Sequence, residues 1–120
     1  MTSVELNIDY ARKVCYFALM NGYAPMCSHL IYPQPGILDD SDPSQRKLGM
    51  QAGFEWQKAA DYLWVATDRG VSQGMIQGLH HWVTSGKGED RVIEVRLRRG
   101  SAASFGLFGA SYQELISGES

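Results

Sequence analysis

A stretch in the middle of the chain combines a buried strand, a tight turn and the start of a helix. Residues 62–67, Tyr-Leu-Trp-Val-Ala-Thr, have no polar alternation, which is typical of a strand buried on both faces of a parallel sheet. Asp68 lies in the turn, and Ser72, Gly74 and Met75 open the helix. Free N–H groups and the helix dipole meet at such a point and favour a phosphate or sugar. We therefore expect a ligand here, although the serine also suits a plain helix cap.

A second polar group lies in the long connection before the next helix. It contains His29, Asp39 and Asp40. A ribose diol is commonly held by a carboxylate, so we expect Asp39 or Asp40 to bind the ligand and His29, just past a predicted strand, to close over it. The alternative is structural: the aspartates serve as turn and cap residues, and His29 bonds to backbone carbonyls. The acidic spacing is not that of an EF-hand, and no metal site is expected.

The other reactive side chains predict no catalytic centre. His80 and His81 are adjacent on a helix and therefore diverge, so they are not expected to bind a metal together. Cys15 and Cys27 have apolar neighbours and are expected to be reduced core thiols of a cytoplasmic protein. No cofactor is expected.

Hydrophobic spacing predicts the elements that position these groups. Helices are expected from about residue 4 to 20, capped by Ser3 or Asn7, from Pro43 to about 60, and from 72 to 84. Strands are expected over 23–27, 62–67 and 91–97, the last with Ile93, Val95 and Leu97 on its buried face. Residues 28–43 form a long connection. Strands that alternate with helices indicate an α/β fold: a parallel sheet with helices on both faces.

Short motifs along the chain occur in a specific order. They are Asn7 with Ala11-Arg12, Gly22-Tyr23-Ala24-Pro25, Ser28-His29-Leu30, Tyr32-Pro33-Gln34, Leu38-Asp39-Asp40, Asp42-Pro43, Leu48-Gly49-Met50, Ala60-Asp61-Tyr62-Leu63-Trp64-Val65 and Ser72-Gln73-Gly74-Met75. With these motifs in this order, the chain resembles the nucleoside 2-deoxyribosyltransferase-like superfamily, especially its small uncharacterised branch in prokaryotic and phage genomes. The similarity runs from about residue 7 to 97.

The resemblance implies a small Rossmann-like or flavodoxin-like sheet and a site for a nucleoside. Enzymes of the superfamily cleave an N-glycosidic bond with a glutamate nucleophile, and aspartates before it hold the sugar. By position, Asp68 falls near the first aspartate, Ser72 replaces the second, and Gly78 stands where the glutamate would be. Without that carboxylate no glycosyl-enzyme intermediate forms. We therefore expect binding without catalysis, with room for a bulky group beside Gly78.

The resemblance also implies that a central first strand is missing or replaced, because Met1 lies only a few residues before the first helix. We expect a domain over residues 1–100 and a tail over residues 101–120. The apolar side chains of the tail, such as Phe105 and Phe108, suit a docking strand or a contact with another subunit. A homo-oligomer is the expected assembly.

Composition narrows the class of partner. The net charge of -2 argues against nucleic acid, although Arg91, Arg96, Arg98 and Arg99 form a local basic cluster that suits a strand edge or an anion contact. No apolar run is long enough for a membrane span. The expected ligand is a nucleoside monophosphate or an ADP-ribose-type signal, which a viral protein would sequester from host immunity. The alternatives are an N-glycosidase that uses Asp68 or Asp61, and a protein-interaction factor that uses the tail.

Overall fold

The computed structural model describes residues 2–97, so the tail predicted over residues 101–120 lies outside the described residues. The chain divides into two compact units, Met1–Trp56 and Gln57–Ser120. The described elements of the first unit are helices, and both described strands lie in the second unit. The boundary between the units falls inside the helix α3.

The first helix, α1 (Ser3–Met20), begins with a capping box. The Glu5 N–H donates to Thr2 Oγ1 (3.1 Å), and the Thr2 N–H donates to Glu5 Oε2 (2.7 Å). This exchange satisfies two backbone donors at once and selects Thr2 as the cap. The prediction of Ser3 or Asn7 as the cap was therefore wrong. The predicted end of this helix at about residue 20 is confirmed, and Gly22, just beyond it, takes a positive φ of 84°.

The segment after α1 differs from its prediction. Residues 23–27 form no strand, and a short helix, α2 (Ser28–Ile31), follows directly. Pro25 has no N–H to donate to a ladder, and the described part of the first unit offers no neighbouring strand. His29 consequently lies on α2 and not behind a strand. The connection over residues 28–43 is partly ordered by this helix.

Helix α3 (Pro43–Ala59) begins and ends where the sequence predicts. Asp42 Oδ1 accepts a hydrogen bond from the Ser44 N–H (3.0 Å), as an N-cap residue does. Gly53 lies on the side of α3 that meets α2: a Cβ at this position would be 2.9 Å from Ser28 Oγ. The glycine therefore permits a close approach between the two helices.

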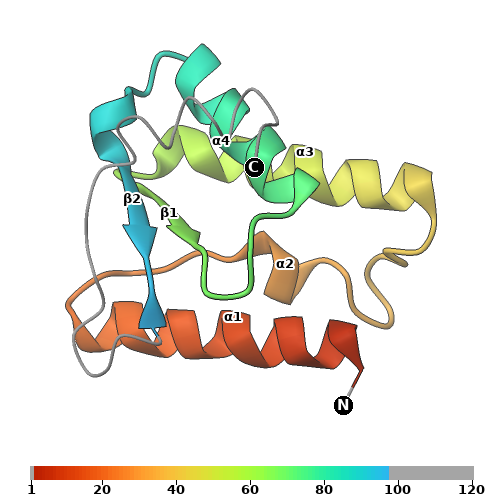
Figure 1. The fold of residues 1–120 in the computed structure, drawn as a ribbon. Coiled ribbons are helices and arrows are strands. Elements are labelled where there is room, and N and C mark those ends of the chain that lie inside the picture. Colours follow the sequence, from red (N-terminus) through yellow and green to blue (C-terminus); the bar gives the residue numbers. More distant parts are fainter. Residues whose placement is uncertain (1, 98–120) are drawn as a thin grey trace. The chain divides into compact units, whose positions relative to one another are not determined.

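The second unit contains a β–α–β motif (Figure 1). Strands β1 (Leu63–Ala66) and β2 (Val92–Val95) pair in parallel, with Leu63 opposite Val92 and Ala66 opposite Val95. Helix α4 (Gln73–Thr84) and a 3₁₀ turn, η1 (Glu89–Arg91), connect them. A parallel pair needs such a crossover, and the α/β class predicted from the sequence is confirmed at this level.

The core of the second unit lies between α4 and one face of the sheet. Val65, Leu79, Trp82 and Val92 form it, and the buried Trp82 Nε1 donates to Gly88 O (2.8 Å). The predicted burial of β2 was only partly right. Val92 faces α4 and is fully buried, and Val95, on the opposite face, is fully buried as well. Alternation alone assigned the buried residues to one face, whereas β2 buries a valine on each.

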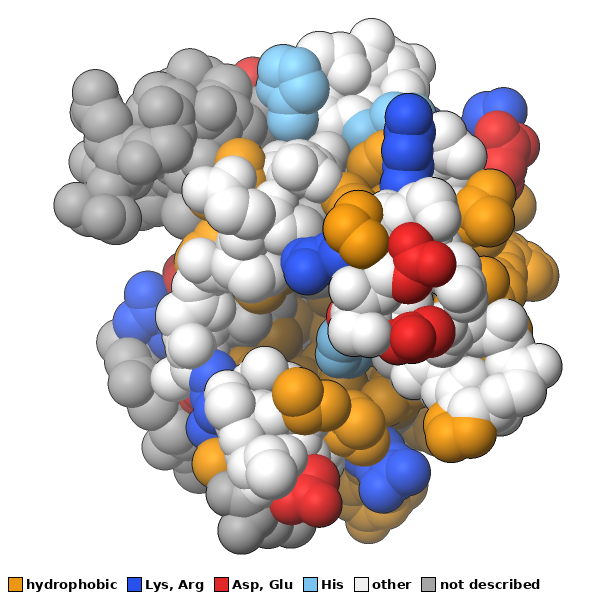
Figure 2. Space-filling view, turned by 90° about the vertical axis from the view of Figure 1, so that its right-hand side faces the viewer, with side chains coloured by type: hydrophobic (Ala, Val, Ile, Leu, Met, Phe, Trp, Pro, Cys, Tyr) orange, Lys and Arg blue, Asp and Glu red, His pale blue; other side chains and the backbone are white. Residues whose placement is uncertain are grey.

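Several large hydrophobic side chains reach the surface (Figure 2). On α1, Tyr16, Leu19 and Met20 are 60–67% exposed. They lie three and four residues apart and so project from one side of the helix. The homo-oligomer expected from the sequence would cover apolar surface of this kind, and it remains a prediction.

Candidate functional site

The carboxyl end of β1 leads into the start of α4, as the sequence predicts. Gly70 takes a positive φ of 88°, and its N–H donates to Thr67 O (3.0 Å), which closes the turn. Ser72 then caps α4: its Oγ accepts from the Met75 N–H (3.2 Å). The Ser72 N–H points to the Met75 sulfur (3.4 Å). The structure thus brings Ser72 and Met75 into contact at the helix N-terminus.

The first turn of α4 favours a negative charge. It contains no acidic residue. The first N–H groups of any helix lack intrahelical partners, and those of Gln73 and Gly74 meet no acceptor in the described chain. Gly74 is also open, because the nearest atom to a Cβ there would be Ser72 Oγ at 3.9 Å. A phosphate or carboxylate fits this end of the helix electrostatically.

Asp68 has a structural partner. Its Oδ1 accepts a hydrogen bond of 2.7 Å from the Leu97 N–H, in the segment that follows β2. This bond joins the two chain segments that leave the carboxyl ends of β1 and β2. Asp68 therefore lies at the predicted end of the sheet, half-buried, with one carboxylate oxygen committed to holding the backbone.

A carboxylate that the sequence reasoning missed lies at the same end of the sheet. Glu94 Oε2 accepts from Thr67 Oγ1 (2.8 Å) and from Arg96 Nε and Nη2 (3.0 and 2.9 Å). Glu94 pairs with Val65 in the sheet register, so its side chain is on the face that α4 covers. Alternation in the sequence separates Glu94 and Arg96 from Ile93, Val95 and Leu97, which were expected on the buried face. The register of β2 against β1 was the missing information.

Gly78 faces a side chain and not open space. Its carbonyl accepts from Gln57 Nε2 (3.0 Å), and a Cβ at Gly78 would lie 3.5 Å from that same nitrogen. Gln57 Oε1 lies 3.0 Å from His81 Nδ1, so this ring nitrogen carries the proton. The expectation of free room beside Gly78 is corrected: the Gln57 amide occupies that side. His80 is exposed, and the two histidines diverge as predicted.

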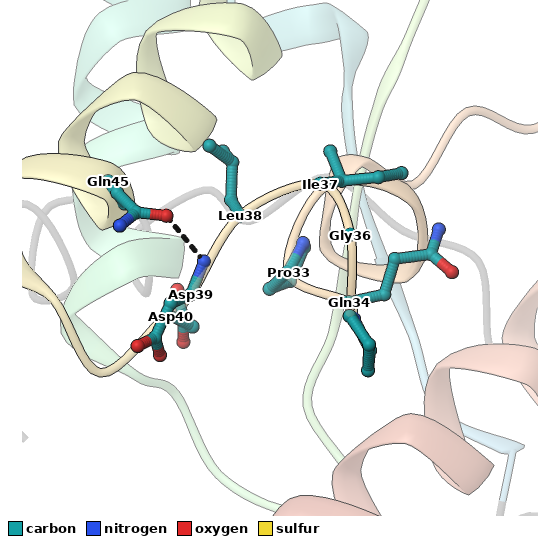
Figure 3. A pocket seen from close by; sticks show the side chains of 9 residues that line it. Pro33, Gln34, Gly36, Ile37, Leu38, Asp39, Asp40 and Gln45 are labelled. Carbon is teal, nitrogen blue, oxygen red and sulfur yellow. Dashed lines mark hydrogen bonds between the residues drawn. The ribbon is translucent and has the colours of Figure 1, made fainter.

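Two of the polar residues predicted in the first unit, Asp39 and Asp40, border a pocket of about 490 Å³ (Figure 3). The turn over residues 33–37 forms one side, and Asp39, Asp40 and Gln45 form the other. His29, although exposed, does not line it. The predicted ligand site thus falls into two parts: Asp39 and Asp40 in one compact unit, and Asp68, Ser72, Gly74 and Met75 in the other.

The two aspartates of the pocket have different surroundings. Asp39 Oδ1 accepts from the Ser41 hydroxyl (2.6 Å) and the Ser41 N–H (3.0 Å). These two bonds hold the pKa of Asp39 below its ordinary value. Asp40 makes no hydrogen bond with the described residues. Asp39 is therefore largely a turn residue, and Asp40 has its carboxylate available.

The cysteines are not activated. Burial raises the pKa of Cys27, and burial together with the neighbouring Cys27 raises the pKa of Cys15. Both therefore stay protonated at neutral pH, which makes them weak nucleophiles. No group of three metal-ligating side chains occurs within residues 2–97. Over the same range, no helix is long and apolar enough to cross a membrane.

A comparison with known protein families identifies the family of the chain. A family model described as a domain of unknown function, DUF7768, matches residues 1–88. The chain belongs to the DUF7768 family. The match covers the elements from α1 to α4 and ends before η1 and β2, so Glu94 and Arg96 lie beyond the matched part of this DUF7768 chain. No curated protein and no solved structure matches the chain significantly.

Proposed function

We propose that this DUF7768 chain binds a nucleotide-derived small molecule, a nucleoside monophosphate or an ADP-ribose-type signal, without cleaving it. The proposal includes a remodelled Rossmann-like fold of the deoxyribosyltransferase kind. The observation that carries it is the Ser72-capped N-terminus of α4, which has no acidic residue in its first turn and follows the carboxyl end of a parallel strand. A phosphate group is the ligand that such an end favours.

Three positions in the second unit bear on whether the chain could cleave its ligand. Gly78, in the nucleophile's position by resemblance, has only a hydrogen as its side chain and is covered by Gln57. Asp61 precedes β1 and so lies at the amino end of that strand. Asp68 binds the Leu97 N–H. Gly78 has no carboxylate, Asp61 lies at the opposite end of β1 from the start of α4, and one oxygen of Asp68 is engaged by the backbone; together these features argue against the N-glycosidase alternative that uses Asp68 or Asp61.

The test is a calorimetric titration of the purified chain with the four ribonucleoside 5′-monophosphates and ADP-ribose. We expect saturable binding of at least one of them. Gln73→Glu places a negative charge in the first turn of α4 and should weaken that binding about three- to tenfold, because it competes with the phosphate for the helix dipole. Gln77→Glu, the same change at an exposed position one turn later, is the matched control and should have little effect. No binding of any of the five ligands, or equal losses in both variants, would contradict the proposal.

A further inference from the structure

The side chain of Glu94 is in an unusual place for a charge. Leu63 and Val65 of β1 and Val92 and Glu94 of β2 form the sheet face that packs against α4. Glu94 is the one charged residue among these four. A carboxylate on a core-facing side is unfavourable unless donors compensate it. Thr67 and Arg96 supply those donors here.

The Glu94–Arg96 ion pair contributes little to the stability of the fold. Glu94 lies on β2 and Arg96 follows two positions later, just after the strand ends, and their side chains are 27% and 31% exposed. Ion pairs with this much solvent contact add little to stability. The bond from Thr67 connects the residue after β1 to β2, but the oxygen of a neutral amide at residue 94 could also accept it. The stability of the fold therefore does not explain why residue 94 carries a charge.

The hydrogen bonds leave one oxygen of Glu94 unused. All three donors converge on Oε2, and no described residue donates to Oε1. The Glu94 side chain is 27% exposed, so it is not closed off from solvent. An oriented carboxylate with one open acceptor suits hydroxyl donors, such as a ribose diol. Glu94 lies near the carboxyl end of β2, on the face that α4 covers. Helix α4 begins at this same end of the sheet.

We infer that Glu94 is the carboxylate that recognises the sugar hydroxyls of the bound nucleotide, with Thr67 and Arg96 as the residues that position it. This inference rests on the proposed function and deepens it. It names a ligand class, a molecule with an anionic group for the start of α4 and vicinal hydroxyls for Glu94. It also moves sugar recognition away from Asp68, whose Oδ1 binds the Leu97 N–H.

The experiment compares two ligands that differ only in those hydroxyls. The wild-type chain, Glu94→Gln and Glu89→Gln are titrated with the ribonucleoside 5′-monophosphate that binds tightest and with its 2′,3′-dideoxy counterpart. We expect the wild type to bind the ribonucleotide about 10- to 100-fold more tightly than the dideoxynucleotide. This ratio corresponds to the free energy of hydrogen bonds to a charged group. Glu94→Gln should lose most of this preference and bind the dideoxynucleotide as the wild type does. Glu89→Gln, an exposed site on η1 with the same change of charge, should behave as the wild type.

Each contrary result has a separate meaning. If the wild type binds both nucleotides equally, the inference fails and the proposed function stands. The same holds if Glu94→Gln keeps the preference, or if it weakens both ligands alike, as a merely structural residue would. If the wild type binds neither nucleotide and does not bind ADP-ribose, the proposed function fails and the inference fails with it.

Discussion

Two helical glycines, Gly53 and Gly78, have opposite surroundings and should respond oppositely to alanine. A Cβ at Gly78 would make ordinary contact with Gln57, so Gly78→Ala should raise the free energy of unfolding by about 0.5–1 kcal/mol through helix propensity. A Cβ at Gly53 would lie 2.9 Å from Ser28 Oγ and 3.4 Å from Ser28 Cβ. Gly53→Ala should therefore lower the free energy of unfolding by about 1 kcal/mol through overpacking.

Chemical denaturation of the single variants and of Gly53→Ala/Ser28→Ala measures these effects. Removal of the Ser28 hydroxyl should recover part of the loss at residue 53. A Gly53→Ala chain that is as stable as Gly78→Ala would show that α2 does not restrict this position.

The aspartates around the start of α3 predict acid sensitivity. Hydrogen bonds from the Ser44 and Gln45 side chains lower the pKa of Asp42, and bonds from Ser41 lower that of Asp39. A folded-state pKa below the unfolded value of about 3.9 stabilises the fold above that pH. This contribution is lost as the pH falls through the lowered folded value.

The measurement is the thermal midpoint between pH 2 and pH 6. Asp42→Asn keeps a residue that caps helices but removes the titration, so its midpoint should fall less steeply in acid than that of the wild type. Asp40→Asn is the control, because Asp40 has no hydrogen bond within the described chain, and its profile should follow the wild type. Equal profiles for wild type and Asp42→Asn would contradict the assignment.

At the residue scale, the sequence predicted local roles better than distant ones. Ser72 as a helix cap and Asp42 as the start of a helix depend on neighbours within three residues, and both are confirmed. Glu94 was missed because its partner Thr67 is 27 positions away, and only the strand register brings the two together. The same reason explains why the backbone bond of Asp68 to Leu97 was not foreseen.

At the scale of elements, Lys87 stabilises the C-terminal end of α3. Lys87 Nζ donates to the carbonyl oxygens of Lys58 (3.2 Å) and Ala60 (2.8 Å) and lies 4.9 Å from the centre of the Trp82 ring. It thereby satisfies carbonyls at a helix C-terminus, where a cation is favourable. Lys87→Met keeps the apolar stem and should cost about 1–2 kcal/mol of unfolding free energy.

The control for Lys87→Met is Lys47→Met, an exposed site on α3, which should change stability by less than about 0.5 kcal/mol. Denaturant titration of both variants checks the difference. A loss at residue 87 no larger than at residue 47 would show that the cap contributes nothing measurable.

The elements themselves were predicted with unequal success. Helices α1 and α4 carry periodic apolar patterns, the start of α3 is marked by Asp42-Pro43, and the structure confirms all three helices. The strand expected over residues 23–27 rested on five residues with a proline among them, and these form no strand. Short apolar runs fit several conformations, and the packing partner decides among them.

At the scale of the whole molecule, the predicted site is distributed between two compact units. Asp39 and Asp40 border a pocket of the first unit, whereas the capped start of α4 and Glu94 belong to the second. The two-stranded parallel sheet of the second unit agrees with the α/β class. The proposed function includes a Rossmann-like fold for this DUF7768 chain.

We propose that the chain holds a nucleotide and leaves its glycosidic bond intact. The most direct measurement is prolonged incubation of concentrated protein with deoxynucleosides and with the nucleotide it binds, followed by chromatography of the recovered ligand. Intact ligand and no free base are the predicted result. Free base that accumulates with time, and that disappears in Asp68→Asn or Glu94→Gln, would show that the chain cleaves the bond.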